Sequence, residues 1–158
     1  MAVQRTLVLL KPDAVQRGLA GTILARFEAK GLKLVGLKLR QFDKSVFEAH
    51  YEPHKSKPFY PGLVKYMTSA PVAAIALEGV DAIEVVRGMM GATNSRKAAP
   101  GTIRGDFGMS FSNNLVHGSD SPESAQRELG LFFGEKGELL DWTPVATPWI
   151  YNVAEELS

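Results

Sequence analysis

The sequence predicts an α+β fold of the α/β sandwich type: a four-stranded antiparallel sheet with ferredoxin-like, split βαβ topology and helices packed on one face. Two observations lead to this fold class. Apolar runs typical of strands alternate with segments of helical period in the order β-α-β-(αα)-β-α-β-α. The 158 residues contain no repeat, linker or low-complexity segment, so we expect a single domain from residue 1 to 158.

The N-terminal segments predict two strands and the helix between them. Residues 6–10 (TLVLL) form a short, continuous apolar run, typical of a strand covered on both faces. Residues 21–31 place apolar side chains at helical spacing and end in glycine, a common helix stop. In residues 32–39 leucine alternates with lysine, but the phase changes at Gly36, which predicts a strand with a β-bulge.

The middle of the chain predicts two short helices, a strand and a longer helix. Asp43 is a candidate N-cap for a helix that runs to about Tyr51, and a second helix follows at residues 63–68. Both are expected outside the sheet. Residues 71–79 (PVAAIALEG) are typical of a strand, and Asp81 is positioned to cap the helix that follows.

The C-terminal part predicts one short strand, one helix and an irregular tail. Residues 91–114 show no period, and a loop of that length is usually functional or disordered. The strand is NLVHG, residues 114–118, after which Ser121 and Pro122 fit the N-cap and first position of a helix. The tail, residues 133–158, is irregular but rich in aromatic residues, so we expect it to pack on the domain.

Composition narrows the class of protein. The absence of cysteine excludes disulfides, thiolate metal sites and cysteine nucleophiles. The net charge of +1, without a basic block, does not suggest nucleic-acid binding. Residues 1–13 resemble neither a signal peptide nor a membrane span, so the sequence predicts a soluble, cytoplasmic protein without membrane contact.

Two charged residues fall where apolar ones are expected. Arg87 lies at the edge of the apolar stripe of its helix and is expected to point inward or nearly so, and Glu128 lies beside the stripe of the last helix. Buried charges require partners. An ion pair between these two residues, or side chains that reach past the core to solvent, would account for them without a functional role.

Other polar residues are less specific. Lys11 ends a strand and Arg104 lies in the long loop, so each could place positive charge at one edge of the sheet, although residue type alone favours a solvated surface position. Thr93 and Asn114 are ordinary turn residues by the same criterion.

Aromatic and histidine residues near residue 50 have simple structural explanations. Tyr51 and Phe59 are typical of core or hinge packing. His50 and His54 have the spacing of a two-histidine metal site, but Pro53 interrupts the helix and no third ligand is evident, so we expect no metal site there. His117, between a strand and a helix, could be a ligand, a base, a nucleophile or a packing residue.

The stretch around His117 resembles a known signature. NLVHGSDSPESAQRE is similar to the active-site pattern N-x-x-H-G-S-D-[SG]-x-[ES] of nucleoside diphosphate kinases. Further segments resemble that family in the expected order: KPDAVQRGLAG, RFEAKGLKLVGLK, KPFYPGLVKYM, PVAAIALEG, GATN and PGTIRGDF. The resemblance extends over residues 5–151.

The resemblance implies an enzyme that transfers the γ-phosphoryl group of a nucleoside triphosphate, typically ATP, to a nucleoside diphosphate. It implies a ping-pong mechanism through a phosphohistidine on His117, broad base and sugar specificity, and a role in maintaining nucleoside triphosphate pools. Glu128 would orient the His117 ring, with Ser119 in the same hydrogen-bond network. A neutral imidazole is available near pH 7, so the chemistry suits the residue.

The same resemblance assigns the remaining site residues. The phosphates would be bound by Lys11, Arg87, Arg104 and Thr93, the base by Phe59 and the sugar by Asn114 and Lys11, while Tyr51 would hold Lys11 near the γ-phosphate. Mg²⁺ is expected to arrive with the nucleotide phosphates, without protein side chains as ligands. The tail resembles that of hexamer-forming members, so we expect a homo-oligomer, with a hexamer favoured over a tetramer.

Two other classes of function are compatible with the fold. A catalytically silent binding relative would keep the architecture, but every chemical position is filled in this chain. A single-stranded nucleic-acid module could share the topology, but the chain has no aromatic sheet motif and no basic face of the kind such modules use.

Overall fold

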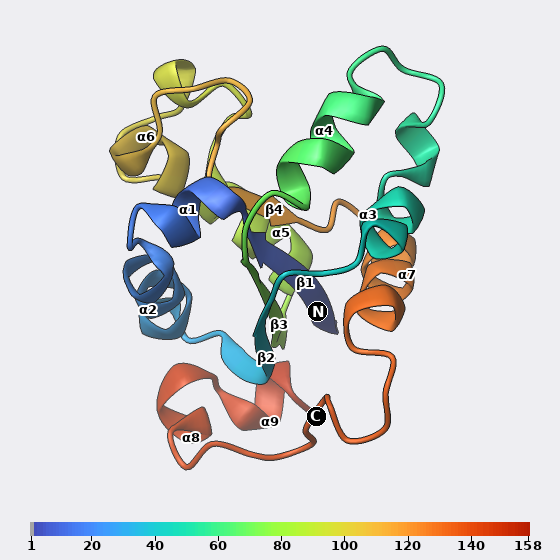
Figure 1. Ribbon diagram of the computed structural model, residues 1–158. Helices are drawn as coiled ribbons and strands as arrows, with labels where there is room; N and C mark the ends of the chain where they lie inside the picture. Colours follow the sequence, from blue (N-terminus) through green and yellow to red (C-terminus); the bar gives the residue numbers. More distant parts are fainter. Residues whose placement is uncertain (1) are drawn as a thin grey trace.

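The computed structural model describes residues 2–158 and contains the predicted four-stranded sheet (Figure 1). The strand order is β2-β3-β1-β4, and every neighbouring pair is antiparallel. The strands are β1 (Val3–Leu10), β2 (Lys33–Arg40), β3 (Val72–Val80) and β4 (Val116–Gly118). This confirms the ferredoxin-like fold class, because β1 and β2 run parallel with β3 inserted between them.

The register of the sheet follows from the apolar pattern. β1 and β3 pair over their whole length, from Val3 opposite Val80 to Leu10 opposite Ala73. The pairing of β2 with β3 shifts between Leu34 and Gly36, which confirms the bulge predicted from the change of phase.

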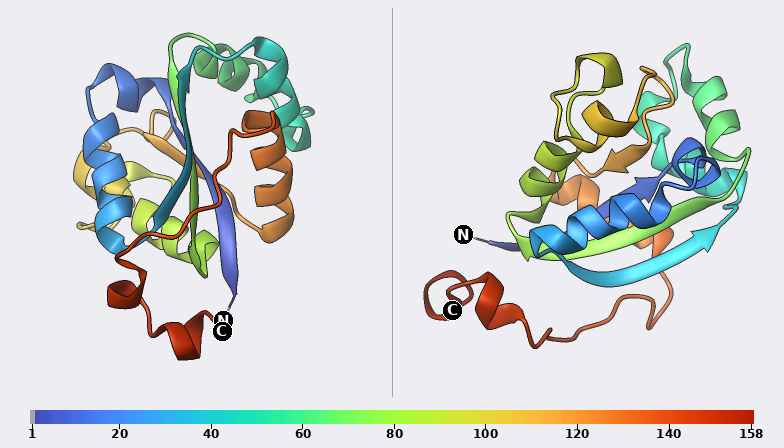
Figure 2. Two further views of the ribbon diagram at one scale, coloured as in Figure 1. Left: turned by 90° about the horizontal axis from the view of Figure 1, so that it is seen from below. Right: turned by 90° about the vertical axis from the view of Figure 1, so that its left-hand side faces the viewer.

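Helices cover both faces of the sheet, so the prediction of a single covered face was wrong (Figure 2). On one face lie α2 (Ala20–Lys30) and α5 (Ala82–Met90), and on the other lie α3 (Lys44–His50), α4 (Tyr60–Met67) and α7 (Pro122–Phe132). In β1, Val8 and Leu10 enter the first core and Leu7 and Leu9 the second. A continuous apolar strand requires cover on both sides.

The sequence did not predict several short helices. Pro12–Gln16 form α1 directly after β1, and Glu52–His54 form η1 between α3 and α4. The segment without clear period contains η2 (Ser95–Lys97) and α6 (Ile103–Phe107). A five-residue helix spans little more than one turn, which is too short to display a period of 3.6.

The predicted caps occupy their positions with different geometry. Asp43 and Asp81 are the N-caps of α3 and α5, but neither side chain forms a cap hydrogen bond, and Asp81 has a left-handed backbone with φ of 51°. Ser121 does accept a hydrogen bond from the backbone N–H of Ser124, at 3.1 Å, and Pro122 follows as the first helical residue. The prediction for α7 is thereby confirmed.

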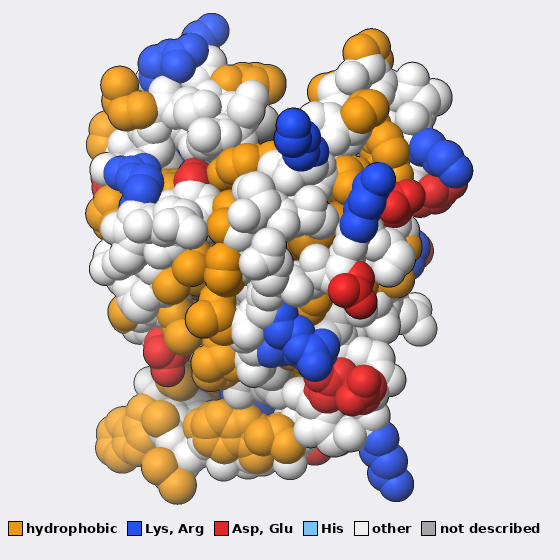
Figure 3. Space-filling model, viewed as in Figure 1, with side chains coloured by type: hydrophobic (Ala, Val, Ile, Leu, Met, Phe, Trp, Pro, Cys, Tyr) orange, Lys and Arg blue, Asp and Glu red, His pale blue; other side chains and the backbone are white. Residues whose placement is uncertain are grey.

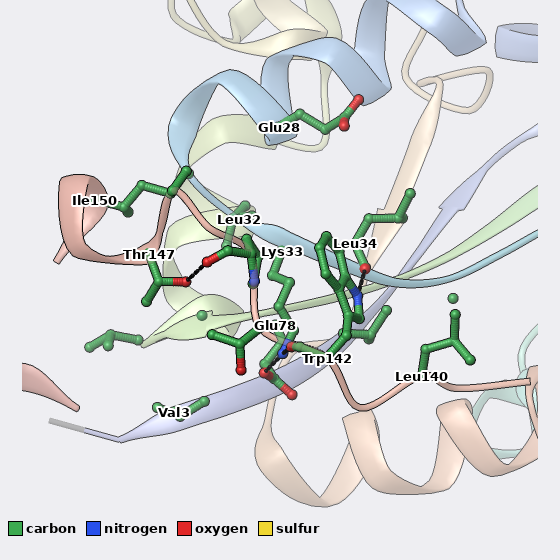
Figure 4. A pocket seen from close by; sticks show the side chains of 18 of the residues that line it. Val3, Glu28, Leu32, Lys33, Leu34, Glu78, Leu140, Trp142, Thr147 and Ile150 are labelled. Atoms are coloured by element: carbon green, nitrogen blue, oxygen red, sulfur yellow. Dashed lines mark hydrogen bonds and ion pairs between the residues drawn. The ribbon is translucent and has the colours of Figure 1, made fainter. Parts of the chain in front are cut away.

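The C-terminal segment crosses the end of the sheet and includes two short helices, α8 (Thr147–Ile150) and α9 (Val153–Glu156) (Figure 1). Its backbone bonds to β2 through Leu140 N–H and Val35 O, and the Trp142 indole N–H donates to Leu34 O, at 2.9 Å (Figure 4). A cavity of about 890 Å³ separates this segment from β2 and α2. None of the candidate site residues lines that cavity.

Apolar side chains gather on the face shown in Figure 3, over β2 and the C-terminal segment. In the tail, the large apolar side chains with the highest exposed fractions are those of Val145 and Trp149. The surface is also hollowed between α6 and α4, on the side where β1 ends and β4 lies behind α1 (Figure 3). Among residues 2–158, no helix combines the length and the apolar character that a membrane span needs.

Candidate active site

His117 occupies the middle of β4, opposite Leu9 of β1. Residues paired across antiparallel strands project on the same side of the sheet. Leu9 belongs to the core beneath α3 and α7, so the His117 ring points toward those two helices. Register and helix placement therefore decide which side chains can reach it.

The residue before β4 has a strained backbone. Leu115 has φ of 74°, a left-handed conformation that is costly for a branched side chain, and its side chain is fully buried. Two contacts hold this turn to the start of α1: Lys11 N–H donates to Leu115 O, at 2.9 Å, and Leu115 N–H donates to Asp13 Oδ2, at 3.1 Å. The turn is therefore attached to the first βα junction.

Glu128 of α7 points inward, as its helical position predicted, and bonds to His117, the partner that the resemblance implied. His117 Nε2 lies 2.9 Å and 3.2 Å from the two Glu128 oxygens, and Ser119 Oγ donates to Oε2, at 2.7 Å. Burial would raise the pKa of Glu128, but the hydrogen bonds from His117 and Ser119 hold this pKa below its ordinary value. An ionised carboxylate only accepts, so His117 Nε2 carries a proton and donates it to Glu128.

Ser119 is itself fixed by the sheet. Its hydroxyl accepts a hydrogen bond from Leu7 N–H at 3.2 Å, and its own N–H donates to Leu7 O at 3.1 Å. Its side chain is fully buried. Ser119 therefore connects the Glu128 carboxylate to the rigid central strand β1.

His50 is the site neighbour that sequence reasoning missed. Its ring packs edge-on against His117, with centroids 4.7 Å apart, and its Nδ1 lies 3.8 Å from Glu128 Oε1. Burial, reinforced by nearby His117, lowers the pKa of His50 to about 3, so the ring is neutral at pH 7. Neither ring nitrogen has a hydrogen-bond partner among the described residues. Only the tertiary fold brings this residue to His117.

Lys11 lies in the interior, which corrects the reading of this residue as a solvated surface charge. Only 9% of its surface is exposed, and its Nζ donates to Asn114 Oδ1 at 2.8 Å. Burial and the charge of Arg104 lower the pKa of Lys11 to about 8, although Asp13 opposes the shift. The ammonium group remains largely charged at pH 7 and is fixed beside Asn114.

Arg104 is also buried, so the prediction of a solvated surface position was wrong for this residue as well. Its guanidinium donates to three backbone carbonyls, those of Asn114 (3.1 Å), Gly91 (3.0 Å) and Val116 (2.7 Å). Burial and nearby Arg87 lower the pKa of Arg104 to about 10, so it is a cation at pH 7. A guanidinium has five N–H donors, and two of them remain for a ligand.

Arg87 is exposed, so the prediction that it points inward was wrong. Its guanidinium is 3.4 Å from Gly118 O, a weak contact, and it forms no ion pair with Glu128 within residues 2–158. A long side chain at the edge of an apolar stripe can lay its methylene groups on the helix and keep its charge in water. The ion pair considered from the sequence is therefore absent from the described chain.

Of the remaining candidate site residues, two are exposed and one is buried. Thr93 and Phe59 are exposed, Phe59 by 53%, and Phe59 directly precedes the first turn of α4. Tyr51 is buried against Phe47 and the edge of His50. Burial and the charge of Glu128 raise the pKa of Tyr51 above its usual range. The described residues show no hydrogen bond between Tyr51 and Lys11, the pairing that the resemblance implied.

The geometry brings the His117 imidazole, whose Nε2 bonds to Glu128, together with two buried cations, Lys11 and Arg104, at the junction of β1 and β4. Such an arrangement can attack an electrophilic centre that carries negative charge and can stabilise that charge during transfer.

Comparison with known proteins gives consistent matches. The family model described as nucleoside diphosphate kinase matches residues 4–137. A nucleoside diphosphate kinase of Rhodopirellula baltica is 58% identical over 148 residues, covering 94% of this chain and 97% of the relative. One from Synechococcus sp. (strain JA-3-3Ab) is 53% identical over 150 residues, covering 95% of this chain and all of the relative.

Solved structures give the same result. The halophilic nucleoside diphosphate kinase of Halobacterium salinarum, solved in complex with CDP, superposes with a TM-score of 0.91 at 49% identity, covering 95% of this chain and 99% of that one. A family protein from Babesia bovis also gives a TM-score of 0.91, at 44% identity, with coverage of 94% and 99%.

Proposed function

Because the chain belongs to the nucleoside diphosphate kinase family, and is therefore a phosphotransferase between nucleoside triphosphates and nucleoside diphosphates, we propose that it acts by a ping-pong mechanism through a phosphohistidine on His117. The observation that carries this proposal is the bond between His117 Nε2 and Glu128. It holds the proton on one ring nitrogen and presents the other as a nucleophile.

In the first half-reaction, His117 Nδ1 attacks the γ-phosphorus of the triphosphate. The N–P bond forms as the bond from phosphorus to the β,γ-bridging oxygen breaks, and the nucleoside diphosphate leaves with that electron pair. The ring becomes cationic while Nε2 keeps its proton. Glu128, 2.9 Å away and anionic, stabilises this charge. The second half-reaction reverses these steps toward a different diphosphate.

We assign the phosphates to Lys11, Arg87, Arg104 and Thr93. A loose phosphoryl-transfer transition state needs positioned positive charge more than proton transfer. The buried side chains of Lys11 and Arg104 are held by hydrogen bonds inside the chain, so they require little reorganisation when the phosphates arrive. Arg87 and Thr93 are exposed and free to adapt to the nucleotide.

The base is assigned to Phe59 and the sugar to Asn114 and Lys11. An exposed aromatic ring can stack on any base, which supports the broad base and sugar specificity that we propose. The Halobacterium salinarum relative was solved with CDP, a pyrimidine diphosphate, which is consistent with a diphosphate substrate for this chain. Tyr51 is proposed to support Lys11 by packing within the same buried region.

The residues around His117 fit a magnesium ion that arrives with the nucleotide. The groups assigned to the phosphates are cations and a hydroxyl, and Glu128 is engaged by His117 and Ser119, so these described residues form no cage of oxygen ligands for the ion. We therefore propose Mg²⁺ held by the nucleotide phosphates. When bound, the ion neutralises charge on the β- and γ-phosphates.

We also propose a homo-oligomer, with a hexamer favoured over a tetramer, and a role in maintaining triphosphate pools in the cytoplasm. The exposed apolar side chains of the tail, such as Val145 and Trp149, support an assembly that covers them. Light scattering distinguishes six chains from four, and a monomer would contradict this part of the proposal.

Phosphoenzyme formation tests the mechanism directly. Incubation with γ-labelled ATP should place acid-labile label on the protein, and any nucleoside diphosphate should remove it. His117→Ala should abolish labelling. His54→Gln, which changes a histidine outside the hydrogen-bonded group of His117, Glu128 and Ser119, should retain it. Absence of label on the parent protein, or label that persists in His117→Ala, would contradict the phosphohistidine.

A further inference from the structure

Three potential metal ligands converge at the Nε2 edge of His117, opposite the proposed nucleophile Nδ1. His50 of α3, His117 of β4 and Glu128 of α7 each offer one ligand atom, and these atoms lie within 4.8 Å of one another. Two of the separations are 2.9 Å, from His117 Nε2 to Glu128 Oε1, and 3.8 Å, from His50 Nδ1 to the same oxygen. The three residues come from three separate elements, so the fold alone creates this cluster.

His50 has unused binding capacity in this cluster. It is 97% buried, and neither of its ring nitrogens has a hydrogen-bond partner among the described residues. Buried polar groups are nearly always paired, because an unpaired one loses its bonds to water without replacement. A neutral imidazole with a free lone pair, directed at a carboxylate and a second imidazole, is a suitable ligand for a metal ion.

We propose that His50, His117 and Glu128 form a binding site for Zn²⁺, separate from the magnesium that accompanies the nucleotide. Two imidazoles and a carboxylate are a frequent zinc ligand set, whereas magnesium prefers oxygen ligands. Ligand atoms at about 2.1 Å from a tetrahedral zinc lie about 3.4 Å apart, between the two measured separations. Small movements of the side chains would therefore suffice to bring the atoms into place.

The surroundings support the coordination. Ser119 donates a hydrogen bond to the other oxygen of Glu128, at 2.7 Å, and so orients the carboxylate in the way that outer hydrogen bonds orient metal ligands. The side chain of His117 is 23% exposed, while that of Glu128 is 5% exposed. His117 is therefore the more exposed of these two ligands, and we infer that an ion reaches the cluster past its ring.

Zinc bound at this site blocks the nucleophile. A neutral imidazole has one lone pair in the plane of its ring. When His117 Nε2 gives that pair to the metal, the proton formerly on Nε2 is carried by Nδ1, and no lone pair remains to attack phosphorus. Zinc binding stands on the cluster alone, whereas the predicted inhibition rests on the proposed function of His117.

Zinc binding can be measured on the full chain without nucleotide. Isothermal titration calorimetry with Zn²⁺ alone should give one site per chain, and Co²⁺ in its place should show the visible absorption of a tetrahedral ion. His50→Phe should weaken binding by at least about ten-fold, since even outer-sphere changes cost 10- to 100-fold. His54→Gln, the matched control, should bind as the parent does.

The phosphorylation assay separates the two proposals. Labelling by γ-labelled ATP with Mg²⁺ in excess, in the absence of zinc, tests His117 as nucleophile and should succeed in both the parent and His50→Phe. Added Zn²⁺ should slow labelling of the parent by at least about ten-fold more than that of His50→Phe. Labelling without zinc also verifies that His50→Phe is folded, and His50→Gln provides a second variant. Absent zinc binding, or equal zinc affinity in the parent and both His50 variants, would overturn the zinc site.

Discussion

The proposed site has a buried half and an exposed half, and they are organised differently. In the buried half, Glu128 already bonds to His117 and Ser119, and Lys11 separately bonds to Asn114. In the exposed half, Phe59 and Thr93 face solvent, and Arg87 has one weak contact with a backbone carbonyl.

The two halves should therefore respond differently to amino-acid substitutions. The geometry of the buried half is determined by partners within the chain, so we expect substitutions there to affect stability and the rate of chemistry. The exposed half obtains its partners only from the nucleotide, so substitutions there should affect substrate binding.

Two arginines give the largest contrast, measured as stability. Arg104→Met removes three hydrogen bonds to backbone carbonyls and should lower the free energy of unfolding by about 3 kcal/mol. Arg87→Met, at an exposed position, should change it by less than about 0.5 kcal/mol. Urea denaturation measures both. Equal losses would show that burial does not separate the two residues.

Glu128→Ala tests the buried half for chemistry. Loss of the charge-assisted bond to His117 should lower kcat roughly 100-fold, which corresponds to about 2.7 kcal/mol, with little change in KM. Steady-state kinetics give both constants. Glu123→Ala, an exposed carboxylate in the first turn of the same helix, is the matched control and should retain parental kinetics. A rise in KM that equals the fall in kcat would argue against an orienting role.

The lowered pKa of Lys11 should make kcat/KM of the free enzyme depend on pH. Its ammonium is charged below the pKa of about 8 and loses its proton as pH rises, so kcat/KM should fall above pH 8, approaching ten-fold per pH unit. Arg keeps its charge in this range, so Lys11→Arg should lack this alkaline decline, even if its activity is lower overall. The pH profiles of the two proteins decide the matter. Parallel profiles would assign the decline to another group.

Phe59→Ala tests the exposed half and should have the smallest effect. Loss of base stacking should raise KM by roughly five- to ten-fold, to a similar extent for purine and pyrimidine diphosphates, with kcat unchanged. Phe111→Ala removes another exposed aromatic ring, outside the proposed site, and serves as the control. An effect confined to one base would contradict broad specificity. A fall in kcat would contradict the prediction that the exposed half affects substrate binding alone.

The sequence predicted the sheet well where short-range patterns determine structure. The change of phase at Gly36 located the bulge, and Ser121 with Pro122 located the start of α7. Such signals need only a few neighbouring residues. The second covered face of the sheet was missed, although the continuous apolar run of residues 6–10 indicated it.

The sequence did not predict those positions in the site that depend on tertiary contacts. The inward carboxylate of Glu128 could be predicted because one helical face determines its direction. Lys11 and Arg104 were expected at the surface, because their burial depends on distant carbonyl and amide oxygens. His50 reaches His117 only through the packing of α3 beside α7, which local spacing does not encode. The roles of the remaining site residues stay predictions until nucleotide binding is measured.

The C-terminal segment has a practical consequence for spectroscopy. Both tryptophans of the chain, Trp142 and Trp149, lie in this segment, and neither is near His117 in sequence or among the residues that contact it. Trp142 donates its indole N–H to β2, while Trp149 is 90% exposed. Intrinsic tryptophan fluorescence should therefore report detachment of the tail or its burial against a neighbouring chain. Within a single chain it should be nearly silent when phosphate reaches the histidine.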